Sequence, residues 1–339
     1  MSGGVVKGWC PDAWRPMMAG DGLLMRVKPR LGRLTRAQAL GLADAAAGHG
    51  NGQIDVTRRA NLQLRGVTDH SWSPLMAHLL ALDLVDGDAA RETVRNILVS
   101  PVWHKDDESC RIASALQTRI GELPPKLPGK VGFVIDAGAQ PLLLEQPGDF
   151  RIERSDRGTL MLRADGRPTG VAVAQGKAVD ALIALARWFV DSGGVAAGRM
   201  ARHDAPLPGW ATGSLPKAPA GQLPVEWGVG RRYGLAFGRI DAATLARLAA
   251  MLPEHAGIRI TPWRTLLLEA PVHIADASLL TDPHDPLLRV DACPGMPSCP
   301  QATVETRDLA RRIAPHVGEA CMSRAAPRGA RGLPPPRSP

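Results

Sequence analysis

One strand–helix–strand order occurs twice in this sequence, and this repeat constrains the fold more than any other feature. Residues 22–30 (GLLMRVKPR) have the apolar content of a strand, and Thr35 then begins a helix with Gln38 at the capping-box spacing. A strand region follows at 54–67, where apolar and polar residues alternate. One face of that region should lie in the core, and the other should carry polar groups.

The same order returns roughly two hundred residues later, in YGLAFGRI, a helical stretch at 241–257 and the strand region IRITPWRTLLLEA. Residues 238–240 (GRI) repeat 32–34 (GRL), and 261–264 (TPWR) align with 57–60 (TRRA). Short α/β units often look alike, but here both the order of the elements and their spacing repeat. The sequence therefore predicts an internal duplication.

Composition narrows the class of protein. The chain has 339 residues, 45% of them apolar, as expected for two or three folded domains. Half of the net charge of +8 comes from arginines in 322–339, which weakens a nucleic-acid interpretation. The remaining basic excess suits a small polyanion as well as it suits DNA, but the sequence has no lysine-rich stripe with interleaved aromatics, so we expect no nucleic-acid partner. The sequence has neither an apolar run long enough to span a membrane nor a hydrophobic signal segment at its start, so we expect a cytoplasmic protein.

The five cysteines are too few and too scattered for a disulfide framework, which favours free, reactive or metal-bound thiols. Cys293 and Cys299 lie six positions apart in CPGMPSCP, a segment stiffened by prolines. We expect a helix to start at 300–301, which would place Cys299 at a helix N-terminus and favour its thiolate. Such a pair suits iron–sulfur ligation, which usually takes four cysteines, although two buried core cysteines are the simpler alternative.

Several blocks together resemble the sulfite/nitrite reductase superfamily and, within it, the precorrin-3B synthase branch. The resemblance covers almost the whole chain, and its specific parts are KGWCPDAWRPMMAGDGLLMRVKPRLGRLT, the 57–66 segment, VRNILVSP, LPGKVGFVID and CPGMPSCPQATVETR. It implies an α+β fold of duplicated ferredoxin-like half-domains with sulfite-reductase-like α+β layers, which hold a 4Fe–4S cluster beside a tetrapyrrole. Cys293 and Cys299 would be two ligands of that cluster.

The resemblance and a Pro/Gly-rich connector together divide the chain. The expected segments are a first half-domain at 1–75, an α+β domain at 76–204, a linker at 205–224, a second half-domain at 225–275, the start of an iron–sulfur and tetrapyrrole layer at 276–320, and an Arg/Pro-rich tail at 321–339.

Basic residues are the expected substrate contacts. Arg59, Arg95 and Lys130 fall on the family's basic substrate-site positions, and Arg65 is a further candidate on the same strand region as Arg59. A precorrin carries acetate and propionate groups, and guanidinium forks bind carboxylates bidentately. Without the resemblance, each arginine would be read as an ordinary salt bridge. No catalytic residue is assigned.

The resemblance implies an oxygenase of aerobic cobalamin biosynthesis that converts precorrin-3A to precorrin-3B by O2-dependent hydroxylation and lactone formation. Electrons would come from NADH through a partner protein, and a non-haem iron, for which no ligands are recognised, would activate O2. Siroheme reductases carry Lys-x-Lys where this chain has Lys130-Val131-Gly132, which favours the precorrin branch. The alternatives are a siroheme nitrite or sulfite reductase and a non-enzymatic, truncated tetrapyrrole-binding protein.

The C-terminal segment departs from the family pattern. The family supplies the other two cluster ligands from a Cys-x3-Cys segment, whereas here Cys321 is followed by an Arg/Pro-rich tail. In a shifted reading frame, residues 322–331 are compatible at every step with His-Val-Ser-Gly-Cys-Ala-Lys-Gly-Cys-Ala, so a frameshift is our hypothesis. As written, the chain lacks two cluster cysteines and is expected to be inactive and poorly stable.

Overall fold

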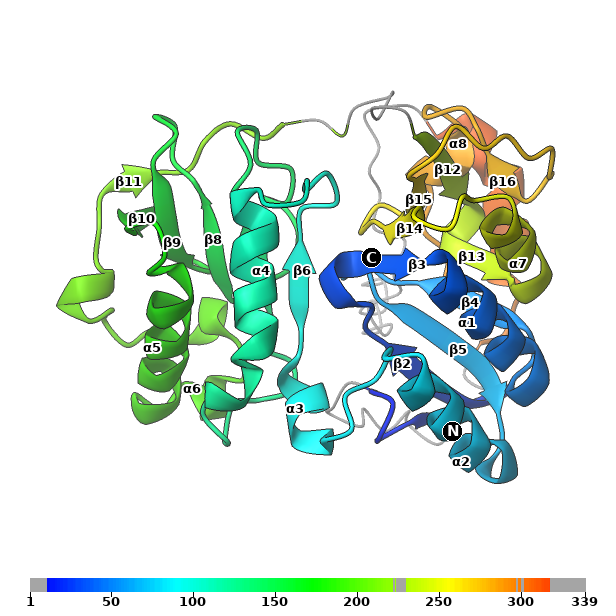
Figure 1. Ribbon diagram of the computed structural model, residues 1–339, viewed down its shortest axis with the longest axis horizontal. Coiled ribbons are helices and arrows are strands. Elements are labelled where there is room, and N and C mark those ends of the chain that lie inside the picture. The colour runs from blue at the N-terminus through cyan, green and yellow to red at the C-terminus, as the bar shows by residue number, and fades with distance from the viewer. Residues whose placement is uncertain (1–10, 222, 224–229, 297, 300–301, 318–339) are drawn as a thin grey trace, which may run out of the picture.

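The computed structural model describes residues 11–221, 223, 230–296, 298–299 and 302–317, and these residues form an α+β protein of two lobes (Figure 1). One lobe holds two five-stranded antiparallel sheets, and the other holds a six-stranded mixed sheet. None of the helices in these residues is long and apolar enough to span a bilayer.

Each five-stranded sheet takes one edge strand from the other sequence repeat. In strand order, the first sheet contains β1 (Met17–Ala19), β2 (Gly22–Val27), β5 (Leu62–Val67), β4 (Gln53–Val56) and β13 (Arg239–Asp241). The second contains β16 (Leu279–Leu280), β12 (Arg231–Leu235), β15 (Thr265–Leu268), β14 (Gly257–Ile260) and β3 (Arg33–Thr35). This exchange of β13 and β3 joins the two half-domains into one folding unit.

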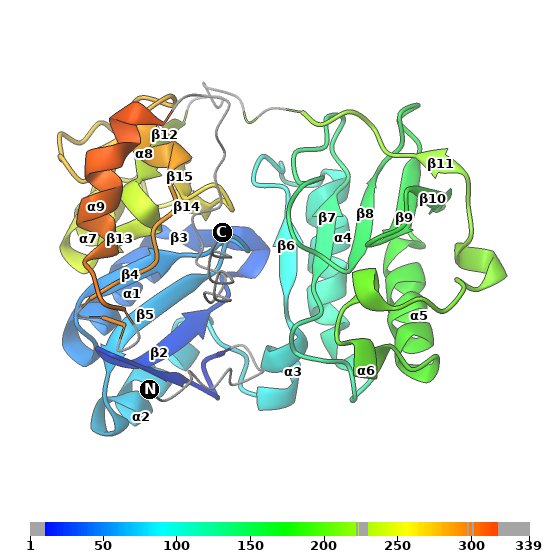
Figure 2. The same cartoon turned by 180° about the vertical axis from the view of Figure 1, so that it is seen from behind.

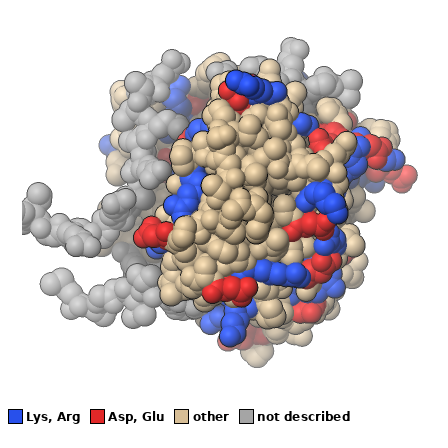
Figure 3. Space-filling model, turned by 90° about the vertical axis from the view of Figure 1, so that its left-hand side faces the viewer, with Lys and Arg blue, Asp and Glu red and all other residues tan. Residues whose placement is uncertain are grey.

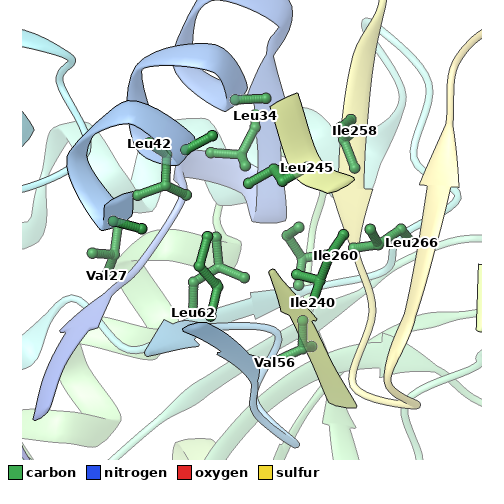
Figure 4. Packing of buried hydrophobic residues seen from close by; sticks show 14 of the residues in the cluster. Val27, Leu34, Leu42, Val56, Leu62, Ile240, Leu245, Ile258, Ile260 and Leu266 are labelled. Carbon is green, nitrogen blue, oxygen red and sulfur yellow. The ribbon is translucent and has the colours of Figure 1, made fainter. Parts of the chain in front are cut away.

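Two equivalent helices cover these sheets. α1 (Arg36–His49) begins with the capping box that the sequence predicts, since Thr35 and Gln38 bond reciprocally. α7 (Ala242–Ala250) is its counterpart, and α2 (Asp69–Ala81) packs beside α1. Figure 4 shows the shared core, where Leu42 of α1 and Leu245 of α7 meet apolar side chains from both sheets.

The backbone repeats at the positions that the sequence comparison aligns. Leu31 and Phe237 adopt φ values of 53° and 57°, and Ala60 and Arg264 adopt 53° and 59°. The left-handed region costs a residue with a side chain about 1 kcal/mol or more, so two matched pairs of such residues reflect a common architecture. The predicted fold of duplicated ferredoxin-like half-domains is confirmed.

The strand region 54–67 is a hairpin, not one continuous strand. β4 and β5 run antiparallel with Val56 opposite Leu62, and Thr57 N donates to Asn61 O across the turn. The polar face of this hairpin is also covered, because Ser298 and α9 (Thr306–Ile313) lie against it (Figure 2). The short α8 (Pro286–Arg289) contacts the turn that precedes β13.

The six-stranded sheet has helices on one face. Its order is β11 (Leu215–Pro216), β10 (Thr169–Ala172), β9 (Leu160–Ala164), β8 (Phe150–Arg154), β7 (Phe133–Asp136) and β6 (Ile97–Val99), with β6, β7 and β8 parallel. α4 (Glu108–Thr118) and α5 (Ala178–Asp191) form a second core with Phe133, Phe150 and Phe189. The short helix α3 (Ala89–Val94) lies between the two lobes, and α6 (Gly194–Ala197) lies next to the end of α5 (Figure 1).

Part of the predicted linker belongs to this sheet. Residues 215–216 pair with β10, Ala218 N donates to Arg154 O, and Gly221 N donates to Pro141 O. The otherwise open edge of β10 explains this pairing, since an edge strand presents unpaired backbone groups and tolerates proline. The division of the chain into segments stays a prediction.

Charged residues at equivalent positions of the two repeats bind the segments that follow the half-domains. Arg259 on β14 donates to the carbonyls of Pro101 (2.9 Å) and Trp103, and its guanidinium lies 4.1 Å from the centre of the Trp103 ring. Asp55, at the same position of β4, accepts from Arg307 of α9 at 3.3 Å. Arg259 of the second repeat therefore binds the segment that follows the first repeat, and Asp55 of the first repeat binds α9, which follows the second.

Candidate functional site

A basic cavity of about 310 Å³ lies where the first half-domain meets the second lobe. Its charged lining residues are four basic ones, Arg15, Arg26, Lys28 and Lys130, and one acidic one, Asp12. Thr93, Asn96 and Gly129 add polar groups. This excess of positive charge suits a ligand that carries several carboxylates.

A larger cavity of about 410 Å³ lies between β13 and α9. Three basic residues, Arg239, Arg307 and Arg311, face three acidic ones, Asp241, Glu305 and Asp308. Because these charges balance, the smaller cavity is the better candidate for binding a polyanion.

The predicted substrate residue Lys130 lines the basic cavity on a clamped loop. Its backbone carbonyl accepts hydrogen bonds from Arg59 Nη2 at 3.1 Å and from Arg199. Arg199 also pairs with Asp149 at 3.3 Å, and Asp149 accepts from Gly132 N at 2.8 Å. Burial raises the pKa of Asp149, although Arg199 opposes the shift. These contacts fix the backbone from which the Lys130 side chain extends.

Arg59 lies next to this loop, in a small adjoining cavity that it lines with Asn96 and Gly132. Asn96 lines both cavities and donates from Nδ2 to Gly129 O at 3.0 Å and to Val131 O at 3.1 Å. A Cβ atom on Gly132 would lie 3.7 Å from Arg59 Nη1. The missing second lysine would therefore have pointed toward Arg59, whose guanidinium donates to the Lys130 carbonyl.

Arg95 lies beneath the basic cavity, and its side chain is only 2% exposed. Its guanidinium donates to Glu92 Oε2 at 2.7 and 3.0 Å and to Lys28 O at 2.7 Å. Glu92 is fully buried, so this ion pair forms part of the core. Arg95 is not among the residues that line the cavity.

Arg65 is likewise buried, with 3% of its side chain exposed. It forms two 2.8 Å bonds to the Asp21 carboxylate and a longer contact of 3.5 Å to Asp55. It also donates to Ser298 O at 3.4 Å, which ties the cysteine segment to the sheet. The contacts of Arg65 are thus structural, and its predicted role in substrate binding stays a prediction.

Lys28 is a cavity residue that the sequence reasoning missed. It directly follows β2, where Leu23, Met25 and Val27 point into the core, so Arg26 and Lys28 share the opposite face. The strand alternation was the signal that could have identified it. Its side chain is 5% exposed, and burial lowers its pKa to about 8.

The two predicted cluster cysteines lie in a loop ahead of α9. Residues 300–301, where we expected a helix to start, lie outside the described residues. The expected start is nevertheless wrong, because 302–305 are not helical, α9 begins at Thr306, and Met296 N pairs with Val304 O. Gly295, with φ of 67°, turns the chain so that Thr306 Oγ1 donates to Cys293 O at 2.6 Å. Cys293, not Cys299, is therefore the cysteine beside the helix start.

The described residues do not complete a four-cysteine site. Cys293 is exposed and Cys299 is half-buried, while Cys110 packs against the second core. Within the described ranges, no group of three or more His, Cys, Asp or Glu side chains could hold a metal ion. Cys10 and Cys321 lie outside the described residues. Cluster ligation by Cys293 and Cys299 stays a prediction.

The charges on the outer face of the second lobe show whether nucleic acid could bind there. Figure 3 shows acidic side chains interspersed with basic ones around a broad uncharged centre. Nucleic-acid binding usually requires a basic stripe or patch, and this face has none.

Comparison with known proteins agrees with the fold and with the resemblance. The family described as the nitrite/sulfite reductase ferredoxin-like half domain matches residues 15–82. A precorrin-3B synthase from Sinorhizobium sp is 28% identical over 346 residues, which is 91% of this chain and 73% of that protein. A ferredoxin–nitrite reductase from Synechococcus elongatus is 34% identical over 95 residues, 28% of this chain and 18% of that protein.

Among solved structures, the NirA protein of Mycobacterium tuberculosis superposes with a TM-score of 0.55 at 17% identity. The match covers 87% of this chain but 64% of that one, so the chain spans less than two thirds of that structure. Residues 15–82 thus form a nitrite/sulfite reductase ferredoxin-like half domain, and the resemblance to a precorrin-3B synthase over most of the chain is confirmed.

Proposed function

We propose that the chain is a precorrin-3B synthase-like oxidoreductase of cobalamin biosynthesis that acts in the cytoplasm. The reaction would hydroxylate precorrin-3A with O2 and close a lactone to give precorrin-3B. The observation that carries this proposal is the basic cavity beside the half-domain, with four cationic side chains and one acidic one. The similarity to a precorrin-3B synthase supports it.

The residues of the cavity would bind and orient the macrocycle. A space of about 310 Å³ accommodates one edge of a tetrapyrrole with its acetate and propionate groups. Arg15 and Arg26 can each bind a carboxylate through two parallel hydrogen bonds, and Lys130 contributes a single point charge from its clamped loop. Arg59 would contribute to the same edge, since Asn96 lines both its cavity and that of Lys130.

The redox chemistry belongs to groups other than these side chains. In the proposal, electrons come from NADH through a partner protein, and a 4Fe–4S cluster and a non-haem iron support oxygen chemistry. The donor set in the described residues does not fit a complete cluster, so no step of the reaction is assigned to it.

A non-enzymatic tetrapyrrole-binding protein is the second candidate. The incomplete set of cluster ligands in the described residues favours it, because the cavity needs no cluster to hold a polycarboxylate. A siroheme nitrite or sulfite reductase is less well supported, since Gly132 lacks the side chain that would point toward Arg59. A siroheme absorption band in the purified protein would support that alternative.

Conversion of precorrin-3A under labelled O2 tests the proposal. The purified chain would be incubated with substrate, NADH and an electron-transfer reductase, and the product mass measured together with bound iron and sulfide. Incorporation of one oxygen atom from O2 would support the oxygenase. Tight binding of precorrin-3A without conversion would support the binding protein, and neither binding nor conversion would contradict both.

A further inference from the structure

We propose that Lys28 anchors a ligand carboxylate at the buried end of the basic cavity, with Glu92 and Arg95 as the residues that position it. This inference rests on the proposed function, because it requires a ligand with carboxylates, and it adds a specific contact to that function.

The geometry leaves the Lys28 ammonium partly unsatisfied. Nζ donates to Glu92 O at 2.5 Å and lies 3.5 Å from Thr93 O, the last carbonyls of α3. An ammonium group has three donors, and the second of these contacts is long. Lys28 also lines the cavity, so a carboxylate entering there can accept a further bond.

Two buried partners fix the position of Lys28. Arg95 donates to the Lys28 backbone carbonyl at 2.7 Å and to Glu92 Oε2 at 2.7 Å. Glu92 Oε2 also accepts from Asp86 N at 2.9 Å, which holds the carboxylate in place. Glu92 Oε1 has no hydrogen bond within the described residues and lies 3.8 Å from Lys28 Nζ. Arg95 therefore acts on the cavity through Lys28.

The ammonium has only a distant and shared counter-ion, because Glu92 lies 3.8 Å away and also pairs with Arg95. The charged groups that face Lys28 are Glu92, Asp12, Arg95 and Arg26. These two acids and two arginines balance, so Lys28 is a surplus positive charge in a buried place. Burying a charge without a close counter-ion is costly, and a ligand carboxylate would reduce that cost.

A pH dependence of binding follows. Burial lowers the pKa of Lys28 to about 8, so the empty site loses the ammonium charge as the pH rises through that value. A carboxylate ligand should then bind about tenfold more weakly at pH 9 than at pH 7, because only the protonated lysine attracts it. An arginine at this position would stay charged and would abolish the decrease.

Titration of the full chain with uroporphyrin, a porphyrin ringed by acetate and propionate groups, tests the anchor. The variants are Lys28→Met and Lys28→Arg, with the exposed Lys217→Met as a matched control and circular dichroism as the check of folding. We expect Lys28→Met to weaken binding at pH 7 by about tenfold or more and to lose the pH dependence. We expect Lys28→Arg to bind without the decrease at pH 9 and Lys217→Met to behave like the unmodified chain.

The outcomes separate the two proposals. If the unmodified chain does not bind uroporphyrin, the tetrapyrrole function itself is contradicted. If the unmodified chain binds and Lys28→Met binds equally well, the anchor alone is overturned. A decrease at pH 9 that persists in Lys28→Arg would also overturn it, because another group would then be titrating.

Discussion

The burial of Lys28 should make the free energy of unfolding depend on pH. Its pKa falls from 10.5 to about 8 on folding, chiefly because the ammonium is buried. The unfolded chain then binds this proton more tightly than the folded chain. Below pH 8 the buried charge therefore lowers the free energy of unfolding by its full amount. This loss disappears as the pH rises from 8 to 10.5.

The size of the effect follows from the shift. At 1.36 kcal/mol per pKa unit, a shift of this size corresponds to about 3 kcal/mol at pH 7. At pH 9.5 the unfolded chain is still mostly protonated at this site while the folded one is not, and about 1 kcal/mol remains. The free energy of unfolding should therefore gain about 2 kcal/mol from this group between pH 7 and pH 9.5.

Urea denaturation of the unmodified chain and of Lys28→Met at both pH values measures this quantity. We expect the difference in unfolding free energy between the two proteins to move by about 2 kcal/mol in favour of the unmodified chain as the pH rises. Lys217→Met is the control and should show no such movement, since 48% of this side chain is exposed in the folded chain and its ion pair with Glu145 lies at the surface. A difference that stays constant from pH 7 to pH 9.5 would refute the reasoning.

Two further substitutions test the structural assignments. Arg95→Met should lower the unfolding free energy by about 3–5 kcal/mol in urea denaturation, because it leaves the buried Glu92 carboxylate unpaired, and a loss below 1 kcal/mol would contradict its placement in the core. Gly238→Ala should cost at least about 1 kcal/mol, since φ is 73° and a Cβ atom would lie 2.8 Å from Val56 O. Gly87→Ala, with open space around it, is the matched control and should differ from the parent by less than 0.5 kcal/mol.

The fold could be predicted largely because its signals are local and repeated. The Thr35–Gln38 spacing specified a capping box, and the aligned 57–60 and 261–264 segments indicated the duplication, although the turn that each segment forms was not predicted. The exchange of β3 and β13 between the two sheets could not be predicted, because the sequence of neither segment alone indicates which distant strand it pairs with.

The site was harder to predict for a physical reason. The resemblance places Arg59 and Arg95 on family positions, and Arg65 is a further candidate on the strand region of Arg59. The sequence does not show whether an acidic partner neutralises these arginines. Asp21 and Glu92 pair with Arg65 and Arg95, and neither arginine lines the basic cavity. The helix start at Thr306 was missed because the turn at Gly295 and the loop it forms depend on contacts between distant residues.

The most direct test of the central claim is an experimental structure of the full chain with uroporphyrin bound. The account predicts that carboxylates of the ring lie within hydrogen-bond distance of Lys28 and Lys130 in the basic cavity beside the first half-domain. A ring bound instead in the charge-balanced cavity between β13 and α9, or bound with no contact to either lysine, would contradict it.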